Sequence, residues 1–477
     1  MGRKRVFLAN LGLRTPMFPL VTPPIGLLSL AAYLRQHLDV EVAVVNQRLE
    51  NLSLKTLAEQ ARAFEAEVVG LSAMTTYAYL LRPAAQAIRE ALPNVLIAVG
   101  GPHASAVKGQ ILHETVADVA VPGEGEIAFT RVLEAFQNNA SFADIPGIAW
   151  RDRSGEIVQN PGSVPMVEHL DDLPLPAYEL IDLPAYWRKQ SIAPVVRRKY
   201  ASIVSSRGCP YRCMWCHSIF GKQIRFHSPE RIVEEIGFHQ RQYGVRDFEF
   251  LDDTVNMKKD RVIRTTELMH QRGLRVKIAF PTGVRSDLFS EDVIEALHGA
   301  GMYYCGFALE TGSPRLQKFV CKNLDIGRFV QAVAETACRR VYTQGFCMMG
   351  FPTETESELQ QTIDVACNSM LHGVAFYTVT PFPGTPLYDY VREHHPEKLV
   401  NIRYDATDFS NMRVNLTDLP DRTLFAYQRK ALRKFFLNPN RVFRLLRDYP
   451  QPHLLPIYLP IFIGRASKGL FGNLRGK

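Results

Sequence analysis

The amino-acid sequence predicts an α/β protein with two separate parallel sheets, the first doubly wound and the second a partial barrel. Two observations predict this fold. Short β-rich runs alternate with helical patterns through residues 5–138, and a second alternating series runs through residues 200–390. A proline-rich stretch without this rhythm separates them. Strands that alternate with amphipathic helices are typical of parallel sheets covered by helices.

The first series contains five β-rich runs with helical patterns between them. The candidate strands are 5–10, 40–45, 68–72, 95–99 and 117–121, and the candidate helices are 25–37, 53–64, 79–91 and 126–137. This pattern predicts a Rossmann-like, doubly wound sheet within residues 1–140. Ligands of such sheets bind at the carboxyl ends of the strands.

Residues 141–195 are predicted to be a linker. Residues 151–156 have the composition of a hairpin turn, and residues 170–176 form a proline-rich connector. Such clusters of turn residues between periodic segments are typical of loops.

The second series contains six candidate strands, which predict a partial TIM-type (β/α)6 barrel over residues 196–395. The strands are 201–206, 247–252, 276–281, 303–309, 343–349 and 374–380, and the helices are near 229–243, 259–272, 291–299, 326–339 and 356–371. A complete barrel of this kind has eight strands. The barrel should therefore have an open side that admits a large substrate or another domain, with its chemistry on the loops after the strands.

Length and composition indicate a globular protein of two or three domains. The chain has 477 residues, of which 46% are hydrophobic and 22% charged, and this composition excludes wholesale disorder. We find no secretory signal and no apolar run of the ~18 residues that a membrane-spanning helix needs. We therefore expect a cytoplasmic protein, in which eight cysteines are not a disulfide scaffold.

The C-terminal region, residues 396–477, is predicted to be a basic and mostly helical extension. Residues 421–477 carry a net charge of +10, whereas residues 1–420 carry −2. One interpretation is a solvated face that packs on the barrel. The other is contact with anionic lipid, with residues 457–463 and 470–471 inserted into the membrane. No nucleic-acid partner is expected, because basic and aromatic residues are not interleaved as in known nucleic-acid motifs.

Three cysteines follow the first barrel strand with the spacing C-x3-C-x2-C. These are Cys209, Cys213 and Cys216, and Gly208 permits an unusual backbone turn before them. Three thiolates on one loop can hold three corners of an iron-sulfur cube and leave the fourth iron open to another ligand. Two alternatives remain. The thiolates could hold zinc together with His217 or a distant residue, or the spacing could be incidental.

With Trp215 in the aromatic position, this loop resembles the C-x3-C-x-aromatic-C signature of the radical S-adenosylmethionine (SAM) superfamily. The resemblance implies a catalytic [4Fe-4S] cluster held by the three cysteines. It continues after later strands, in residues 250–254, 306–313 and 350–354, which resemble the SAM-binding loops of this superfamily. The SAM-binding residues that it implies are Trp215, Asp252, Asp253, Glu310, Gly350 and Pro352.

A further set of motifs resembles the subgroup that carries an N-terminal cobalamin-binding domain. The matching segments are residues 21–26, 100–103 and 123–126, with 378–386 on the last barrel strand. The cobalamin-binding residues implied are Thr75, Thr76, Gly100, Gly101, His103, Gly123, Glu124 and Gly125. The loop at residues 10–15 lacks the histidine of the D-x-H-x-x-G motif, so the lower axial ligand of cobalt stays open.

Structural explanations exist for each of these matches. Gly100 and Gly101 suit an ordinary turn. Glu124 could complement the dipole of the helix that follows it. Asp252 or Glu310 could cap a helix.

The resemblance implies reductive cleavage of SAM to methionine and a 5′-deoxyadenosyl radical. The implied reaction is C-methylation of an unactivated carbon in a small molecule, either lipid-like or a tetrapyrrole, with flavodoxin or ferredoxin as electron donor. The sequence also resembles the anaerobic Mg-protoporphyrin monomethyl ester cyclase group. The first alternative is therefore a cyclase, oxidase or ring-rearranging radical SAM enzyme without net methyl transfer. The second is a non-catalytic zinc or nucleic-acid-binding module.

Overall fold

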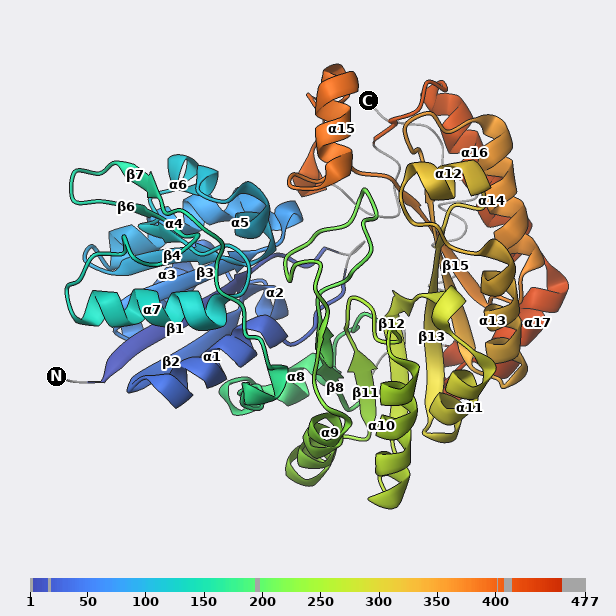
Figure 1. Ribbon diagram of the computed structural model, residues 1–477, viewed down its shortest axis with the longest axis horizontal. Helices are drawn as coiled ribbons and strands as arrows, with labels where there is room; N and C mark the ends of the chain where they lie inside the picture. The colour runs from blue at the N-terminus through green and yellow to red at the C-terminus, as the bar shows by residue number, and fades with distance from the viewer. Residues whose placement is uncertain (1–2, 16–18, 194–197, 401, 407–413, 457–477) are drawn as a thin grey trace.

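The computed structural model describes residues 3–15, 19–193, 198–400, 402–406 and 414–456, and contains two lobes (Figure 1). The N-terminal lobe is built on a seven-stranded sheet of order β2-β1-β3-β4-β5-β6-β7. Its strands are β1 (Lys4–Leu11), β2 (Val40–Asn46), β3 (Val68–Ala73), β4 (Leu96–Gly100), β5 (Val119–Ala120), β6 (Ala149–Arg151) and β7 (Ile157–Gln159). The first five are parallel, which confirms the doubly wound sheet.

Helices cover both faces of this sheet, and each face has its own apolar core. The helices are α1 (Ile25–His37), α3 (Leu54–Ala63), α4 (Leu81–Ala91), α5 (Gly101–Val107), α6 (Gln110–Glu114) and α7 (Gly125–Gln137). α1 and α7 pack with Val6 and Leu8 of β1, whereas α3, α4 and α6 pack on the face that contains Phe7 and Ala9. Alternate residues of β1 therefore serve opposite cores, as the period of a strand requires.

The hairpin predicted at residues 151–156 connects β6 and β7, which pair antiparallel. β6 also pairs antiparallel with β5, so the hairpin adds two strands to the N-terminal sheet. Both strands lie within the stretch that we expected to be a linker. The domain boundaries at residues 140 and 195 stay predictions.

The second lobe is built on a six-stranded, wholly parallel sheet of order β15-β14-β13-β12-β11-β8, which confirms the partial barrel. Its strands are β8 (Tyr200–Ile203), β11 (Asp247–Phe250), β12 (Lys277–Val284), β13 (Met302–Glu310), β14 (Tyr342–Met349) and β15 (Gly373–Thr378). β8 and β15 are the two edges of this sheet and do not pair, so the barrel is open between them.

The helices of the second lobe lie on the outer face of the sheet (Figure 1). They are α9 (Pro229–Tyr243), α10 (Lys259–Gln271), α11 (Glu291–Gly299), α13 (Ile326–Cys338) and α14 (Glu356–Asn368). The sequence predicted all five within three residues at either end. Their apolar faces and the strands form one continuous core.

The basic extension contains two further helices, α16 (Asp421–Phe436) and α17 (Pro439–Asp448), as predicted. α16 packs on α14 and β15, where it buries Leu424, Ala431 and Phe435 in the barrel core. Arg441 of α17 is buried and donates to the carbonyl oxygens of Cys367 (2.7 Å) and Ser369 (3.0 Å). Within the described residues, no helix has both the length and the apolar character to cross a membrane.

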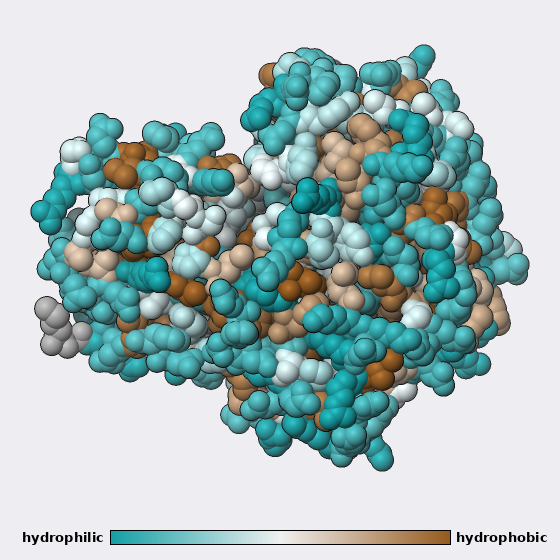
Figure 2. Space-filling model, viewed as in Figure 1, coloured by the Kyte–Doolittle hydropathy of each residue, from teal (hydrophilic) through white to brown (hydrophobic). Residues whose placement is uncertain are grey.

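The loops that follow β8 and β15 both contact the N-terminal lobe. Helix α15 (Pro386–His394) rises from the second of these loops, and the space-filling outline is notched between it and the N-terminal lobe (Figures 1 and 2). The carboxyl ends of both sheets therefore supply the residues that surround the junction.

Candidate functional site

The cysteine loop follows β8 and is closed at its base by a two-stranded ribbon, β9 (Ser206–Arg207) and β10 (Arg225–Phe226). Gly208 has φ +92°, and a Cβ there would lie 2.4 Å from the carbonyl oxygen of Gln223. Only glycine fits this turn without displacing backbone. The N–H of Met214 donates to Val320 (3.1 Å), which fixes the middle of the loop against the rest of the barrel.

The three thiols differ in their surroundings. Cys209 Sγ lies 3.3 Å from the hydroxyl of Thr254, and Cys216 is exposed. Desolvation by the surrounding protein, with Cys213 next in importance, raises the pKa of Cys216 to about 12. Desolvation also raises the pKa of Cys213. The thiols of Cys213 and Cys216 are therefore protonated without metal, and a metal that binds them displaces the protons.

This donor set fits a cubane cluster. All three thiols are free, and they come from one loop. In the described part of the chain, no three His, Cys, Asp or Glu side chains are gathered to hold a single metal ion. The corners of a cube are separate atoms, so its thiolate ligands need not converge on one point.

Glu310 ends β13 in a left-handed conformation (φ +63°) and forms a buried ion pair with Lys322. Lys322 Nζ lies 3.3 Å from the carboxylate and 5.9 Å from the centroid of the Trp215 ring. Burial raises the pKa of Glu310, and the charge of Lys322 opposes this shift. Lys322 was missed in the sequence, because no motif surrounds it.

Asp252 is buried between the ends of β8 and β11. One carboxylate oxygen accepts hydrogen bonds from the hydroxyls of Ser205 (2.7 Å) and Ser206 (2.5 Å). The other oxygen is buried and has no hydrogen-bond partner among the described residues. Burial raises the pKa of this carboxyl, while Arg261 and the serines lower it. Asp253, next to it, is exposed.

The turn after β14 begins at Gly350, which has φ +98°. One oxygen of the buried carboxyl group of Glu354 accepts the N–H groups of Gly350 (2.6 Å) and Phe351 (3.1 Å). Desolvation raises the pKa of Glu354 to about 8. Pro352 is buried in the same turn.

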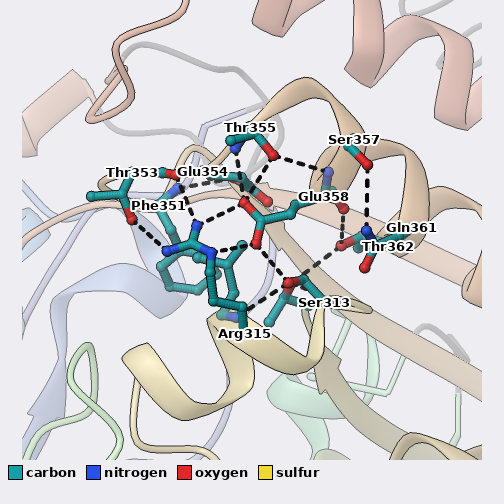
Figure 3. A network of polar contacts seen from close by, with 12 residues as sticks. Ser313, Arg315, Phe351, Thr353, Glu354, Thr355, Ser357, Glu358, Gln361 and Thr362 are labelled. Carbon is teal, nitrogen blue, oxygen red and sulfur yellow. Dashed lines mark hydrogen bonds and ion pairs between the residues drawn. The ribbon is translucent and has the colours of Figure 1, made fainter.

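A network of charged and hydroxyl groups joins this turn to the loop after β13 (Figure 3). Arg315 donates to both oxygens of Glu358 (2.8 and 2.7 Å) and to the carbonyl oxygen of Thr353 (2.9 Å). Ser313 donates to Glu358 (2.7 Å), which also completes a capping box with Thr355 at the start of α14. The two loops predicted to bind SAM are therefore fixed to each other.

The predicted cobalamin-binding residues gather at the carboxyl edge of the N-terminal sheet. His103 in α5 is buried, and its Nδ1 lies 3.3 Å from the hydroxyl of Thr75 in the turn after β3. Thr76 is half-buried beside it. Desolvation lowers the pKa of His103, and His217 lowers it further. Since His217 directly follows Cys216, the two lobes place both histidines within electrostatic range.

Glycines bring the loops after β4 and β5 close to their neighbours. Gly101, next to Gly100, has φ +80°, and a Cβ there would lie 2.2 Å from the hydroxyl of Ser72. The N–H of Gly123 donates to the hydroxyl of Ser105 in α5 (2.8 Å). Gly125 is the first residue of α7. This small-residue edge can accommodate a large cofactor beside backbone N–H groups.

Glu124, also predicted to contact cobalamin, is buried in ion pairs between the lobes. One oxygen lies 3.2 Å from guanidinium nitrogens of Arg207 and Arg225 and accepts the N–H of Val167 (3.2 Å). The other oxygen also contacts Arg225. The arginines were missed, although Arg207 stands two residues before Cys209.

The loop after β15 contacts both other regions. The Phe382 ring lies 6.1 Å from the His217 ring. Gly384 has φ +79°, and its Cβ would lie 2.9 Å from Cα of Ala106 in α5. The tertiary structure thus brings the cysteine loop, the last-strand loop and α5 together, as one candidate site. A doubly wound domain whose strand ends face an open barrel with a cysteine loop defines a two-domain cofactor enzyme.

Comparison with protein families agrees with this class. Residues 17–133 match the B12 binding domain, and residues 203–366 match the radical SAM superfamily. The chain therefore contains an N-terminal B12-binding domain followed by a radical SAM domain. A radical SAM domain implies a [4Fe-4S] cluster and SAM, and a B12-binding domain implies cobalamin. The sequence had predicted all three cofactors.

Similar proteins share this organisation. The chain is 29% identical to an uncharacterized methyltransferase of Pyrococcus horikoshii, over 94% of this chain and 93% of that protein. It is 25% identical to the anaerobic magnesium-protoporphyrin IX monomethyl ester cyclase of Rubrivivax gelatinosus, over 87% of this chain and 75% of that protein. The solved cobalamin-dependent SAM radical enzyme OxsB has the same fold, with a TM-score of 0.75 and 16% identity over 98% and 72% of the chains.

Proposed function

We propose that this radical SAM enzyme uses cobalamin to methylate an unactivated carbon of a small molecule, lipid-like or tetrapyrrole. One observation carries the proposal. Gly384 of the last-strand loop packs on α5, the helix of His103, while Phe382 of the same loop lies beside His217. A group bound at the edge of the N-terminal sheet would thus face the end of the barrel. The methyltransferase of Pyrococcus horikoshii, similar over nearly its whole length, supports the same reaction.

Cys209, Cys213 and Cys216 would hold the cluster as thiolates. When bound, the cluster supplies an electron that cleaves SAM into methionine and a 5′-deoxyadenosyl radical. The protein holds the reactants in place and excludes water. Met214, bonded to Val320 on one side and Leu387 on the other, keeps the cysteine loop in one position.

The loops after β11, β13 and β14 would hold SAM. Trp215 and Pro352 offer apolar surface, while Asp252, Asp253 and Glu310 offer carboxylate oxygens. Glu354 aligns the backbone at Gly350 by accepting two N–H groups of the turn. The Arg315–Glu358 pair keeps the two loops at a fixed separation.

The edge of the N-terminal sheet would hold cobalamin. Thr75, Thr76 and His103 are its polar side chains, and Gly100, Gly101, Gly123 and Gly125 let a ligand approach the backbone. Burial lowers the pKa of His103 and so favours its neutral ring, in which one nitrogen can accept a hydrogen bond. Glu124 would act on this edge indirectly, because both of its oxygens already have partners.

The cyclase of Rubrivivax gelatinosus supports a second candidate, a ring-forming reaction with the same cofactors and no net methyl transfer. The product S-adenosylhomocysteine separates the two, because only methyl transfer from SAM forms it.

The test is anaerobic reconstitution with iron, sulfide and hydroxocobalamin, followed by addition of SAM and titanium(III) citrate. Mass spectrometry then quantifies 5′-deoxyadenosine and S-adenosylhomocysteine in one sample. We expect both products, with the second dependent on cobalamin. Deoxyadenosine alone would favour the cyclase-like reaction. Neither product from cluster-loaded protein supplied with a substrate extract would contradict the proposal, and zinc without iron or sulfide would revive the non-catalytic alternative.

Two partners belong to this proposal. An electron donor such as flavodoxin or ferredoxin would reduce the cluster in a cytoplasmic setting. An anionic membrane surface would contact the basic extension, where exposed apolar side chains flank the corner between α16 and α17 and continue along α17: Leu437, Val442, Phe443 and Leu446. Basic side chains next to them would bind lipid head groups. The insertion segments predicted at residues 457–463 and 470–471 lie outside the described residues.

A further inference from the structure

We infer that Arg207, with Glu124 and Glu126, is a positioning clamp that sets the distance between bound cobalamin and the cluster. The inference rests on the proposed function and adds to it residues that touch neither cofactor. It follows from a buried group of four charges at the junction of the lobes. These charges belong to Arg207, Arg225, Glu124 and Glu126.

The two arginines come from the base of the cysteine loop. Arg207 of β9 and Arg225 of β10 are direct partners in an antiparallel pair, so their side chains leave the ribbon on the same face. Arg207 is separated from Cys209 by Gly208 alone, the residue that has no room for a side chain. A displacement of Arg207 would therefore be passed to the first thiol.

The two carboxylates come from the start of α7. Glu124 is the N-cap residue of this helix and Glu126 lies in its first turn, so both also interact favourably with the helix dipole. Gly123, which precedes them, is bonded through Ser105 to α5. The carboxylates are thus fixed to the loops that we propose for cobalamin.

The contacts between these groups leave little freedom. Arg207 donates to Glu126 (2.7 Å) and lies 3.2 Å from an oxygen of Glu124. Arg225 contacts both oxygens of Glu124. The side chains of the four residues are between 1% and 8% exposed, and their charges balance.

Such a balanced group is better suited to fixing position than to adding stability. The cost of removing the charges from water offsets much of their attraction, so a buried ion pair is weak evidence for stability. Loss of one partner, in contrast, leaves a buried charge that can be relieved only by movement or by entry of water. The rate of group transfer between two cofactor sites depends steeply on the distance between them. A misplacement of 1 Å can lower this rate about a hundredfold.

The test uses two clamp variants. Glu126→Gln keeps the shape of the side chain and removes its charge, and Arg207→Lys keeps the charge and removes the planar guanidinium group that contacts two carboxylates. Arg89→Lys is the matched control, because Arg89 pairs with Asp118 inside the N-terminal lobe (2.7 Å). The first readout is the distance between cob(II)alamin and the reduced cluster, measured by pulsed dipolar EPR on holoenzyme. The second is the ratio of S-adenosylhomocysteine to 5′-deoxyadenosine with SAM and titanium(III) citrate.

We expect both clamp variants to broaden or shift the distance distribution and to lower the product ratio about tenfold, with cluster content and deoxyadenosine formation near wild type. The control should match wild type in both. Wild-type distance and ratio in both clamp variants would overturn the inference, as would equal losses of both products at an unchanged distance. If wild-type enzyme makes no S-adenosylhomocysteine, the proposed methylation fails, and the distance measurement still tests the clamp.

Discussion

The ring of Trp215 lies 5.5 Å from the ring of Phe351, with an angle of 59° between the ring planes. This contact joins the cysteine loop to the turn after β14, so the aromatic residue of the motif packs against the loop predicted to bind SAM. Aromatic pairs of this kind contribute about 0.5–1.5 kcal/mol beyond their burial.

We therefore expect Trp215→Ala to raise the Kd for SAM about two- to tenfold, while Trp215→Phe stays within about twofold of wild type. Equilibrium dialysis of labelled SAM with cluster-loaded protein measures this. An unchanged Kd in the alanine variant, at equal cluster content, would show that Trp215 does not support the SAM site.

The cysteine assignment predicts that Cys209→Ala, Cys213→Ala and Cys216→Ala each abolish formation of 5′-deoxyadenosine. Each variant leaves two thiolates for a cluster that needs three. Cys338→Ala is the control, because Cys338 is also exposed but lies at the end of α13. Iron and sulfide analysis with product quantification checks the outcome. Deoxyadenosine at wild-type rates in any of the three variants would refute the assignment.

The turn at Gly208 predicts a specific cost for a side chain. Gly208→Ala should prevent stable cluster assembly, because the new Cβ would meet backbone oxygens of Gln223 and Phe220. Gly155→Ala is the matched control. Gly155 has a similar φ (+88°), and an added Cβ there would have no atom within 4 Å, so the substitution strains the backbone without a steric clash. The strain alone should cost about 1–3 kcal/mol. Thermal unfolding and iron content of both variants measure the two effects, and equal loss in both would attribute the effect to strain.

Glu354 predicts a pH-dependent stability. Its pKa is raised to about 8 in the folded protein, from an ordinary value near 4.5, because burial penalises the charged form. The contribution of this group to the free energy of unfolding is therefore fully present below pH about 4.5, its pKa in the unfolded chain. It is lost as the pH rises toward about 8, by up to about 1.4 kcal/mol per pH unit. Urea unfolding between pH 5 and 8 should show that Glu354→Gln is less sensitive to pH than wild type. Parallel pH profiles would contradict this.

The exposed corner of the basic extension predicts binding to anionic vesicles. Leu437 is 69% exposed and Phe443 64%. The double variant Leu437→Ser/Phe443→Ser should reduce co-sedimentation with phosphatidylglycerol vesicles several-fold, because insertion of these apolar side chains contributes to binding. Val330→Ser, which alters an exposed apolar side chain on α13, is the control. Equal sedimentation of all three proteins would remove the membrane as a partner of this surface.

The sequence predicted most of the elements because they obey local rules. The helices near 229–243 and 291–299 appear with the same ends in the structure, because apolar residues recur in both with the helical period. The first is also capped by the side chain of Ser228, which accepts the N–H of Arg231. The hairpin at 151–156 was also recognisable from its turn residues. Its pairing with β5 was not, because nothing local specifies which edge strand it joins.

The sequence by itself determined two alternating series of strands and helices and a cysteine loop with the spacing for a cluster. Both follow from short-range periodicity and from the chemistry of thiolates. The tertiary structure alone decided which side chains would meet. It paired Glu310 with Lys322, placed His103 near His217, and drew Glu124 into the ion pairs of Arg207. These contacts join residues that no period relates. The first forms when the loop after β13 folds back within the barrel, and the other two form only when the two independently patterned lobes pack against each other.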